Sequence, residues 1–385
     1  VRIRPMLLYL TGITWAIYSY SNVFFLFAPY LALMEFSSEN AGILVGAFYA
    51  ATSLVRPASG WIVERAGIRR TLVVSALLCL GAAFFKFVTA SFWPLLLIRL
   101  AMGGAYGVFV VALTTYQALV IPEEARGADF AVVTLGSLSC LFTVVPLADW
   151  LLRHHLPALF LTVPLCMAAL CVVLSCRLPP LPKGKNPETD WGTWGELYRD
   201  TPFWRILTSC ALFGLCDASI VSLPALILAK GLKTTSFAFA SGLGALTMRT
   251  LGRKFFNRYP RCVFAGPSLM VMAFFLYLTA SAVSDLQLAA CGLFYGVGMG
   301  YGYPAHLALV GDLAPARLRA KSSALVHFCY DASWFVLPVY IGFAAGRLGT
   351  AGAFKLMALA SVAFGVGVTA MWAAYTKNVN RRSLA

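Results

Sequence analysis

The sequence is a succession of long apolar runs separated by short polar stretches. Twelve such runs stand out, and each is close to or longer than the roughly 20 residues that cross a bilayer as one helix. Their approximate ranges are 6–34, 40–63, 70–90, 92–121, 128–152, 156–176, 203–230, 234–250, 262–283, 286–310, 321–346 and 350–375. A helix pairs its own backbone groups and is therefore stable in lipid. The pattern predicts an all-α integral membrane protein with twelve transmembrane helices.

Composition excludes several other classes of protein. Of the 385 residues, 60% are hydrophobic and 12% are charged, which is too apolar for a water-soluble core. The net charge of +15 sits mainly in short loops beside the spans, so it does not indicate a nucleic-acid partner. The ten cysteines form no C-x-x-C pair, and His154 and His155 have no acidic or cysteine companions. We therefore expect no disulfide framework, metal or cofactor.

The loop charges predict the orientation. If both termini are cytoplasmic, the outer loops carry only Arg153, Lys230, Lys233 and Arg347, and the other loop cations lie inside. This skew follows the positive-inside rule, so we expect an even number of spans. The absence of long outer loops favours a bacterial inner (plasma) membrane.

A polar interruption divides the chain into two parts. It runs from Cys176 to Trp204, opens with prolines and charges, and contains a short amphipathic stretch. We predict a six-helix N-terminal bundle over residues 1–178, a cytoplasmic linker with a short amphipathic helix over 179–202, and a six-helix C-terminal bundle over 203–385.

The two parts are related in sequence. "NVFFLFAPYLALM" from Asn22 aligns with "DASIVSLPALILA" from Asp217 at an offset of 195 residues, which pairs Pro29 with Pro224. At an offset of 193, "PEEARGADF" aligns with "PARLRAKSS", and the glycines at 103 and 107 fall on those at 296 and 300. Similar offsets at separate places indicate a duplicated six-helix unit.

The stretch "GWIVERAGIRR" from Gly60 carries a family resemblance. It resembles the G-x-x-x-D-R-x-G-R-R loop between spans 2 and 3 of the major facilitator superfamily, with Glu64 in place of aspartate. Together with the span count, linker and repeat, the resemblance covers the whole chain. It implies two pseudo-symmetric bundles that give a small-molecule substrate alternating access to the two sides of the membrane.

The same resemblance implies that this loop latches the cytoplasmic side. The residues that inherit the role are Gly60, Glu64, Arg65, Gly67, Arg69 and Arg70. Gly60 is expected to let span 2 pack closely against a neighbour. Gly67 is expected to take a left-handed conformation that reverses the chain.

Ionisable side chains inside predicted spans are candidates for function, because burying them in lipid is costly. Asp217 lies near the middle of span 7, and its repeat mate in span 1 is Asn22. A desolvated carboxyl group there can exchange a proton near neutral pH. The alternative is a structural hydrogen-bonded pair. His327 and Asp331 are four residues apart on one helix face, and they form either a proton relay or a packing contact.

Two arginines also lie inside predicted spans. Arg99, in "LLLIRLAMGGAYG", resembles the R-x-x-x-G element of proton-coupled antiporters of the superfamily, with Met102 replacing the usual glutamine. We expect Arg99 to face a cavity, with a structural ion pair as the alternative. Arg56 lies near the cytoplasmic end of span 2, where its side chain can reach the headgroups. The span 5 antiporter element is largely missing, since "LFTVVPLADW" keeps only Pro146.

These features favour a proton-coupled exporter of small molecules, resembling the drug and metabolite efflux branch with its arabinose-efflux-like permeases. An alternative is a proton-coupled symporter that imports a small organic anion. A membrane-embedded enzyme is disfavoured, because "HFCYD" spaces histidine and aspartate by four residues rather than five and no G-x-S-x-G motif is present. We expect the protein to act as a monomer in the lipid bilayer, with protons as the coupling ion.

Overall fold

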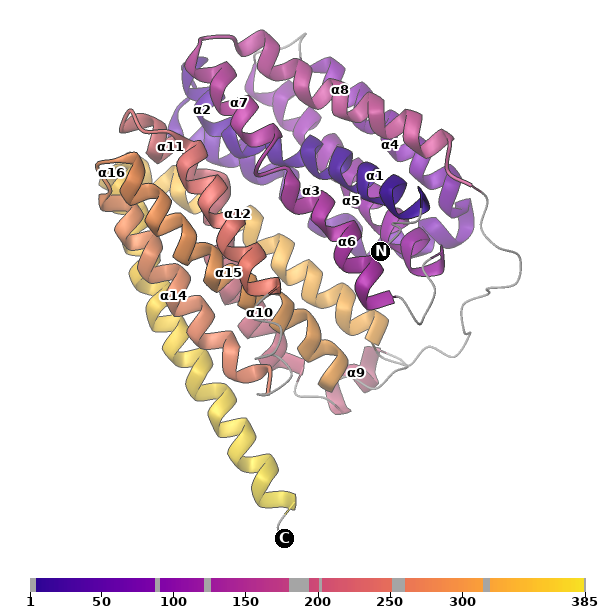
Figure 1. Cartoon of the computed structure of the whole chain (residues 1–385), viewed down its shortest axis with the longest axis vertical. Helices are drawn as coiled ribbons and strands as arrows, with labels where there is room; N and C mark the ends of the chain where they lie inside the picture. Colours follow the sequence, from indigo (N-terminus) through magenta and orange to yellow (C-terminus); the bar gives the residue numbers. More distant parts are fainter. Residues whose placement is uncertain are drawn as a thin grey trace. The chain divides into compact units, whose positions relative to one another are not determined.

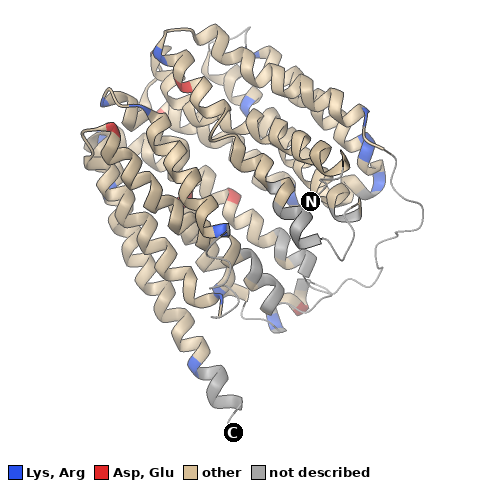
Figure 2. Cartoon of the chain, viewed as in Figure 1, with Lys and Arg blue, Asp and Glu red and all other residues tan. Residues whose placement is uncertain are grey.

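The computed structural model describes residues 5–86, 91–120, 126–179, 194–200, 203–250, 260–313 and 319–383. Within these ranges the regular elements are helices, and no strand is present. Figure 2 shows long helical stretches without charged residues, with Lys and Arg mostly near helix ends. Among the described residues, nine helical stretches are long and apolar enough to cross a membrane, so the protein is an integral membrane protein, as its sequence predicts.

By its internal contacts the chain forms two compact units, Val1–Pro187 and Glu188–Ala385. Figure 1 traces the helices of each in chain order. The first unit contains α1 (Pro5–Asn22), the short 3₁₀ helix η1 (Val23–Leu26), α2 (Phe27–Leu33), α3 (Ser38–Ala66), α4 (Ile68–Phe85), α5 (Phe92–Val120), α6 (Arg126–Ser139), α7 (Val144–Arg153) and α8 (Pro157–Cys176). Helix α5 packs against α3 and α4, α4 packs against α8, and α1 packs against both α6 and α8.

The second unit contains α9 (Trp194–Asp200), α10 (Phe203–Asp217), α11 (Ser219–Ala229), α12 (Thr234–Thr250), α14 (Cys262–Ser281), α15 (Asp285–Leu313) and α16 (Arg319–Ser383). Gly349 divides α16 into two helices, because its φ of 71° and ψ of 158° are not helical. Helix α15 packs against α12 and α14, and α16 packs against α14 and α10.

These helices follow the twelve predicted segments. Helices α1, η1 and α2 together form the first segment, α6 with α7 the fifth, α10 with α11 the seventh, and α16 the last two. The all-α membrane fold class is therefore confirmed, and the described helices are consistent with the twelve predicted spans. The predicted linker, 179–202, lies mostly outside the described residues, and α9 is the part of it that the structure describes as a helix.

The two units repeat their helix packing as well as their sequence. A Cβ on Gly103 of α5 would lie under 3.0 Å from the main-chain oxygen of Phe48 in α3. A Cβ on Gly296 of α15 would lie equally close to the main-chain oxygen of Ser241 in α12. The offset of 193 relates both glycines and both carbonyl groups. The duplicated glycines therefore mark the same close helix crossing in each unit.

Spans 1 and 7 are interrupted at matching places by an irregular turn, called a break below, at which Asn22 and Ala218 keep right-handed helical dihedral angles. Helix α1 ends at Asn22 and continues through η1, whereas α10 ends at Asp217 and α11 begins at Ser219. Two prolines, Pro29 and Pro224, follow the breaks at equal distances in the repeat. Proline lacks the N–H that would bond the carbonyl four residues earlier, and its ring crowds that carbonyl, so the preceding turn is loosened. The polar pair predicted from the repeat thus lies at the two discontinuities.

Candidate functional site

Asp217 is the centre of a buried polar cluster in the second unit. Its side chain is 3% exposed, and its Oδ2 accepts a hydrogen bond from the Tyr330 hydroxyl of α16. Among the described residues its Oδ1 has no hydrogen-bond partner. The Tyr295 hydroxyl of α15 donates toward the main-chain oxygens of Cys216, at 3.0 Å, and Asp217, at 3.1 Å. Tyr295 therefore stabilises the carbonyl groups that the break in span 7 leaves without helical partners.

Arg249 joins this cluster, although sequence reasoning missed it as a site residue. It lies in the last turn of α12 and interacts electrostatically with Asp217 and Tyr330. Its Nε is buried and has no hydrogen-bond partner among the described residues. The signal that could have found it is the repeat, since the offset of 193 pairs Arg249 with Arg56, an arginine already placed inside a span.

The His327 and Asp331 pair lies on the same helix as Tyr330. Asp331 is 9% exposed and His327 is half-buried. The residue of α16 that reaches Asp217 is the neighbour of Asp331, Tyr330. The predicted proton relay through His327 and Asp331 therefore stays a prediction. In the first unit, Asn22 is half-buried at the end of α1, and its side chain makes no capping hydrogen bond to η1.

Arg99 lies in the interior of the first unit. It is 0% exposed, its Nε donates to the Leu44 carbonyl at 3.0 Å, and its Nη2 donates to the Val45 carbonyl at 3.3 Å. Its Cζ lies 4.7 Å from the ring centroid of Phe24 and 4.8 Å from that of Phe27. Its Nη1 is buried and has no hydrogen-bond partner among the described residues, and the predicted cavity-facing role stays a prediction. Carbonyl oxygens and aromatic faces stabilise its charge.

Lys86 was missed as a site residue by sequence reasoning. It follows the last residue of α4, yet it is only 3% exposed. Its Nζ lies 4.1 Å from the ring centroid of Phe24 and 3.6 Å from that of Phe27, and it has no hydrogen-bond partner among the described residues. Two buried cations therefore share the same two aromatic rings. Sequence alone gives no signal for this arrangement, because it depends on how η1 turns the rings.

The predicted latch begins on α3. Gly60 is exposed, and a Cβ there would meet no heavy atom within 4 Å. The expectation that Gly60 allows close packing is therefore wrong in this structure. Arg65 is exposed, with its Cζ 4.4 Å from the Trp61 ring centroid. The side chain of Glu64 lies outside the described residues.

The latch continues through the turn into α4. Gly67 has a φ of 82° and a ψ of 141°, so the expected positive φ is present, although ψ is not that of a left-handed helix. Its N–H donates to the Val63 carbonyl at 3.0 Å. The Arg69 Nη2 donates to the Cys176 carbonyl at 2.5 Å, which ties the start of α4 to the end of α8. Arg70 is exposed.

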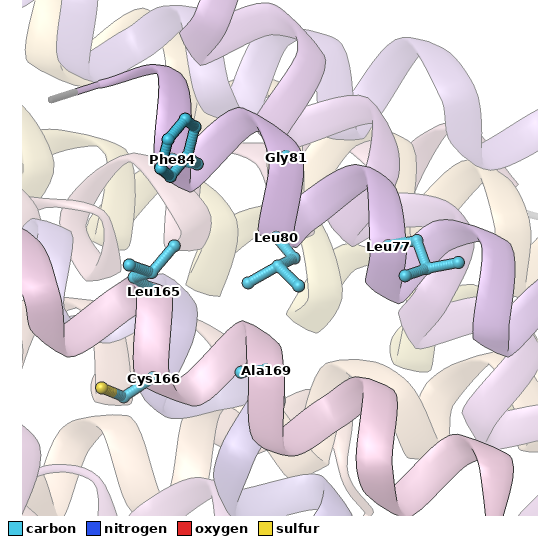
Figure 3. A pocket seen from close by; sticks show the side chains of 7 residues that line it. All are labelled: Leu77, Leu80, Gly81, Phe84, Leu165, Cys166 and Ala169. Carbon is cyan, nitrogen blue, oxygen red and sulfur yellow. The ribbon is translucent and has the colours of Figure 1, made fainter. Parts of the chain in front are cut away.

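An apolar groove on the first unit lies between α4 and α8 (Figure 3). It is lined by Leu77, Leu80, Gly81, Phe84, Leu165, Cys166 and Ala169. None of the candidate site residues lies in it, so it is not the candidate site. Among the described residues, no group of three or more His, Cys, Asp or Glu side chains is arranged to hold a metal ion.

Comparisons with known proteins agree with this architecture. Residues 10–338 match the family model of the Major Facilitator Superfamily. A bacterial homologue of the human lysosomal transporter Spinster, inward-facing and occupied, has a similar structure, with a TM-score of 0.74 and 15% identity over 97% of this chain and 96% of that one. The nucleoside transporter NupG gives a TM-score of 0.77 at 13% identity, over 96% and 99% of the two chains.

A D-xylose–proton symporter gives a TM-score of 0.76 at 13% identity, over 94% of this chain and 96% of that one. At identities this low, the structural likeness shows a shared fold and nothing more. No curated protein matches the sequence significantly.

Proposed function

Since the chain belongs to the major facilitator superfamily, and so is a membrane transporter rather than an enzyme, we propose that it exports a small molecule in exchange for protons. The observation that carries the proposal is Asp217. This carboxyl group is buried at the break of a transmembrane helix, where Tyr330 bonds one oxygen and the other has no hydrogen-bond partner among the described residues. Discontinuous helices of secondary transporters hold their ion and substrate sites at such breaks.

Asp217 has the surroundings that a proton carrier needs. Burial disfavours its charged form, whereas the hydrogen bond from Tyr330 and the positive charge of Arg249 favour it. Because these effects oppose each other, small changes in hydration decide whether the proton stays bound. The protonation state of such a carboxyl group therefore depends on which side of the membrane it faces.

The proposed cycle follows from this balance. A proton binds Asp217 while the site faces the outside. The neutral carboxyl group then allows the protein to return to its inward-facing state. Proton release inside restores the charged form, to which the substrate binds. The substrate-bound protein then turns outward and releases its cargo. Exchange results because proton and substrate favour opposite protonation states of one group.

A second candidate is proton-coupled import of a small organic anion. The observation that favours it is the buried Nε of Arg249, which lacks a hydrogen-bond partner among the described residues. A carboxylate on the substrate would supply that partner. One protein with a similar fold is a D-xylose–proton symporter.

Flux in reconstituted vesicles tests both candidates. Purified protein is placed in right-side-out and inside-out vesicles, and a panel of drugs, metabolites and organic anions is assayed under an imposed pH gradient. Export predicts that acid inside inside-out vesicles drives substrate into them. Import predicts uptake into right-side-out vesicles when the outside is acidic. Transport that ignores the pH gradient would contradict both candidates.

Two variants locate the coupling. Asp217→Asn is expected to abolish the response to the pH gradient while leaving exchange of substrate for substrate. Asp149→Asn is the matched control, because Asp149 is also a buried carboxylate but lies in the first unit and accepts a hydrogen bond from Arg153 at 3.0 Å. Equal behaviour of the two variants would remove Asp217 from the mechanism.

The remaining expectations belong to the same proposal. We place the protein in a bacterial inner membrane as a monomer, with both termini in the cytoplasm and the latch residues closing the cytoplasmic side. The domain boundaries 1–178, 179–202 and 203–385 are part of it. Protease accessibility of tags on the two termini in right-side-out vesicles measures the orientation, and protection of both tags is the expected result.

A further inference from the structure

Lys86 and Arg99 bring two basic side chains together in the interior of the first unit. They are 3% and 0% exposed. The Lys86 Nζ lies 3.6 Å from the centroid of Phe27, and the Arg99 Cζ lies 4.8 Å from the same centroid. Both cations also contact Phe24. The two basic side chains therefore pack against the same two aromatic rings.

No described carboxylate faces this pair. The electrostatic partners of the two side chains among the described residues are each other and the phenols of Tyr20 in α1 and Tyr49 in α3. Beyond these, Tyr30 of α2 stacks on Phe27, and the thiols of Cys79 in α4 and Cys171 in α8 lie near Tyr20. Phenols and thiols in an apolar interior are neutral, so they do not compensate two positive charges.

The two cations differ in how readily they release a proton. A guanidinium stays charged in proteins, whereas a buried lysine amine deprotonates readily. Arg99 has two carbonyl acceptors and one unpartnered nitrogen, Nη1, whereas the single nitrogen of Lys86 has no hydrogen-bond partner among the described residues. We propose that Lys86 is a proton-binding site of the first unit, neutral while it packs against Phe24 and Phe27 and protonated when that packing opens.

The position of the two rings connects this site to span 1. Phe24 lies in η1 and Phe27 begins α2, so the amine rests on the discontinuity of the span. A short 3₁₀ stretch inside a helix often marks a hinge. Protonation moves a proton from hydronium to the lone pair of Nζ and leaves water. The new charge is repelled by Arg99 and is better solvated in water, so it favours opening at this hinge.

The proposal adds a second proton site to the proposed transport function. Its role in transport rests on proton coupling, but protonation of Lys86 is measurable without any substrate. The experiment records the melting temperature of the purified full-length protein in detergent micelles from about pH 9 to about pH 6. The variants are Lys86→Met and Lys86→Gln, which carry no charge, and Lys86→Arg, which carries one at every pH.

Lys86 is proposed to be neutral in the packed state and charged in the unfolded chain. The folded protein therefore loses stability as the pH falls, because protonation favours the unpacked state. The melting temperature of wild type is therefore expected to fall further below that of Lys86→Met as the pH drops from about 9 to about 6, by several degrees in all, and to approach it only above the ordinary lysine pKa of about 10.4. Lys86→Gln should follow Lys86→Met. Lys86→Arg is expected to be less stable than both across the whole range.

Lys355→Met is the matched control, because the Nζ of Lys355 also faces an aromatic ring, Tyr277, at 5.7 Å, but does so in the second unit. It should keep the pH response of wild type. The same set is repeated with Asp217→Asn, so that a failure of the Asp217 mechanism leaves the Lys86 result intact.

Three outcomes would overturn the proposal. The first is a constant difference between wild type and Lys86→Met at every pH, and the second is Lys86→Arg as stable as Lys86→Met. The third is stabilisation by chloride over gluconate that is lost in Lys86→Met, since a bound anion would then neutralise a charged lysine.

Discussion

At the scale of single residues, the proposed proton site depends on the hydrogen bond from Tyr330 to Asp217. The hydroxyl stabilises the carboxylate, so Tyr330→Phe is expected to leave the proton bound at higher pH. Hydrogen bonds to charged groups contribute about 1.5–3 kcal/mol, which corresponds to about one to two pH units. The pH profile of proton-driven transport should move to alkaline pH by roughly one unit.

Tyr340→Phe provides the control for this shift. Tyr340 lies on the same helix and donates to the Ala353 carbonyl at 3.4 Å, so its loss removes a hydroxyl without touching Asp217. Its pH profile should match that of wild type. A Tyr330→Phe profile that moves to acidic pH, or moves no further than Tyr340→Phe, would show that Tyr330 does not control the carboxyl.

Asp217 was predictable from the sequence, because a carboxyl inside an apolar run is conspicuous and its repeat mate is polar. The surroundings of Arg99 were not. Hydropathy shows that a guanidinium is buried, but the acceptors come from the Leu44 and Val45 carbonyls, which belong to another span. Lys86 lies at the end of its helix, where sequence reasoning expects a side chain to reach water.

At the scale of helices, the duplicated glycines allow two spans to approach each other closely. Gly103→Ala would place a Cβ under 3.0 Å from the Phe48 carbonyl. Overpacking of this kind typically costs about 1–3 kcal/mol, because the helices must separate. We expect a melting temperature several degrees below wild type, measured on purified protein. Gly296→Ala should behave in the same way, since it meets the Ser241 carbonyl.

Gly104→Ala is the control on the same helix. A Cβ there would meet no heavy atom within 4 Å. Its melting temperature should equal or exceed that of wild type, because alanine is a better helix former than glycine. Equal stability of Gly103→Ala and Gly104→Ala would mean that the crossing is looser than the structure shows.

The breaks in spans 1 and 7 belong to the same scale. Replacing Pro29 or Pro224 with alanine restores an N–H to the helix and favours a continuous span. Each substitution is expected to slow transport about tenfold, equivalent to about 1.4 kcal/mol, while the melting temperature stays the same or rises. Vesicle flux and melting of the same preparations measure the two effects.

Pro164→Ala tests whether any proline in a span gives this result. Pro164 lies inside α8, which has no described break. Normal flux in Pro164→Ala with slow flux in Pro29→Ala would support a role for the discontinuity itself. Comparable loss in both would assign the effect to general helix strain.

The helices were more predictable than their breaks. Apolar runs and loop charges indicate where spans lie, and the spacing of Gly103 and Gly296 indicates their crossings. Hydropathy does not reveal that α1 ends at Asn22 and α10 at Asp217, since a span with a break is as apolar as a continuous one. Aligned prolines were visible in the sequence, but their effect depends on how neighbouring helices bond the freed carbonyls.

At the scale of the whole molecule, the repeat gives the two units the same architectural features. Close crossings and helix breaks recur at offsets of 193 and 195. What differs is the charge at the break, which is an amide at Asn22 and a carboxyl at Asp217. The sequence therefore predicted the symmetry of the architecture, while the asymmetry of the chemistry depends on a few side chains.

This asymmetry leads to a test of the repeat as a functional unit. Asn22→Asp in the Asp217→Asn background moves the carboxyl from one break to the other. If both breaks serve one pathway, the swapped protein should regain at least a tenth of the wild-type response to a pH gradient, a residual loss of about 1.4 kcal/mol. Proton movement is measured with a pH-sensitive dye inside the vesicles, together with substrate flux.

Ser21→Asp in the same background separates position from mere charge. Ser21 is buried one residue before Asn22, so an aspartate there adds a carboxyl to the same span on a different side of the helix. Recovery with Asn22→Asp but not with Ser21→Asp would show that the break itself positions the proton site. Recovery with both, or with neither, would mean that the register shared by Asn22 and Asp217 does not extend to function.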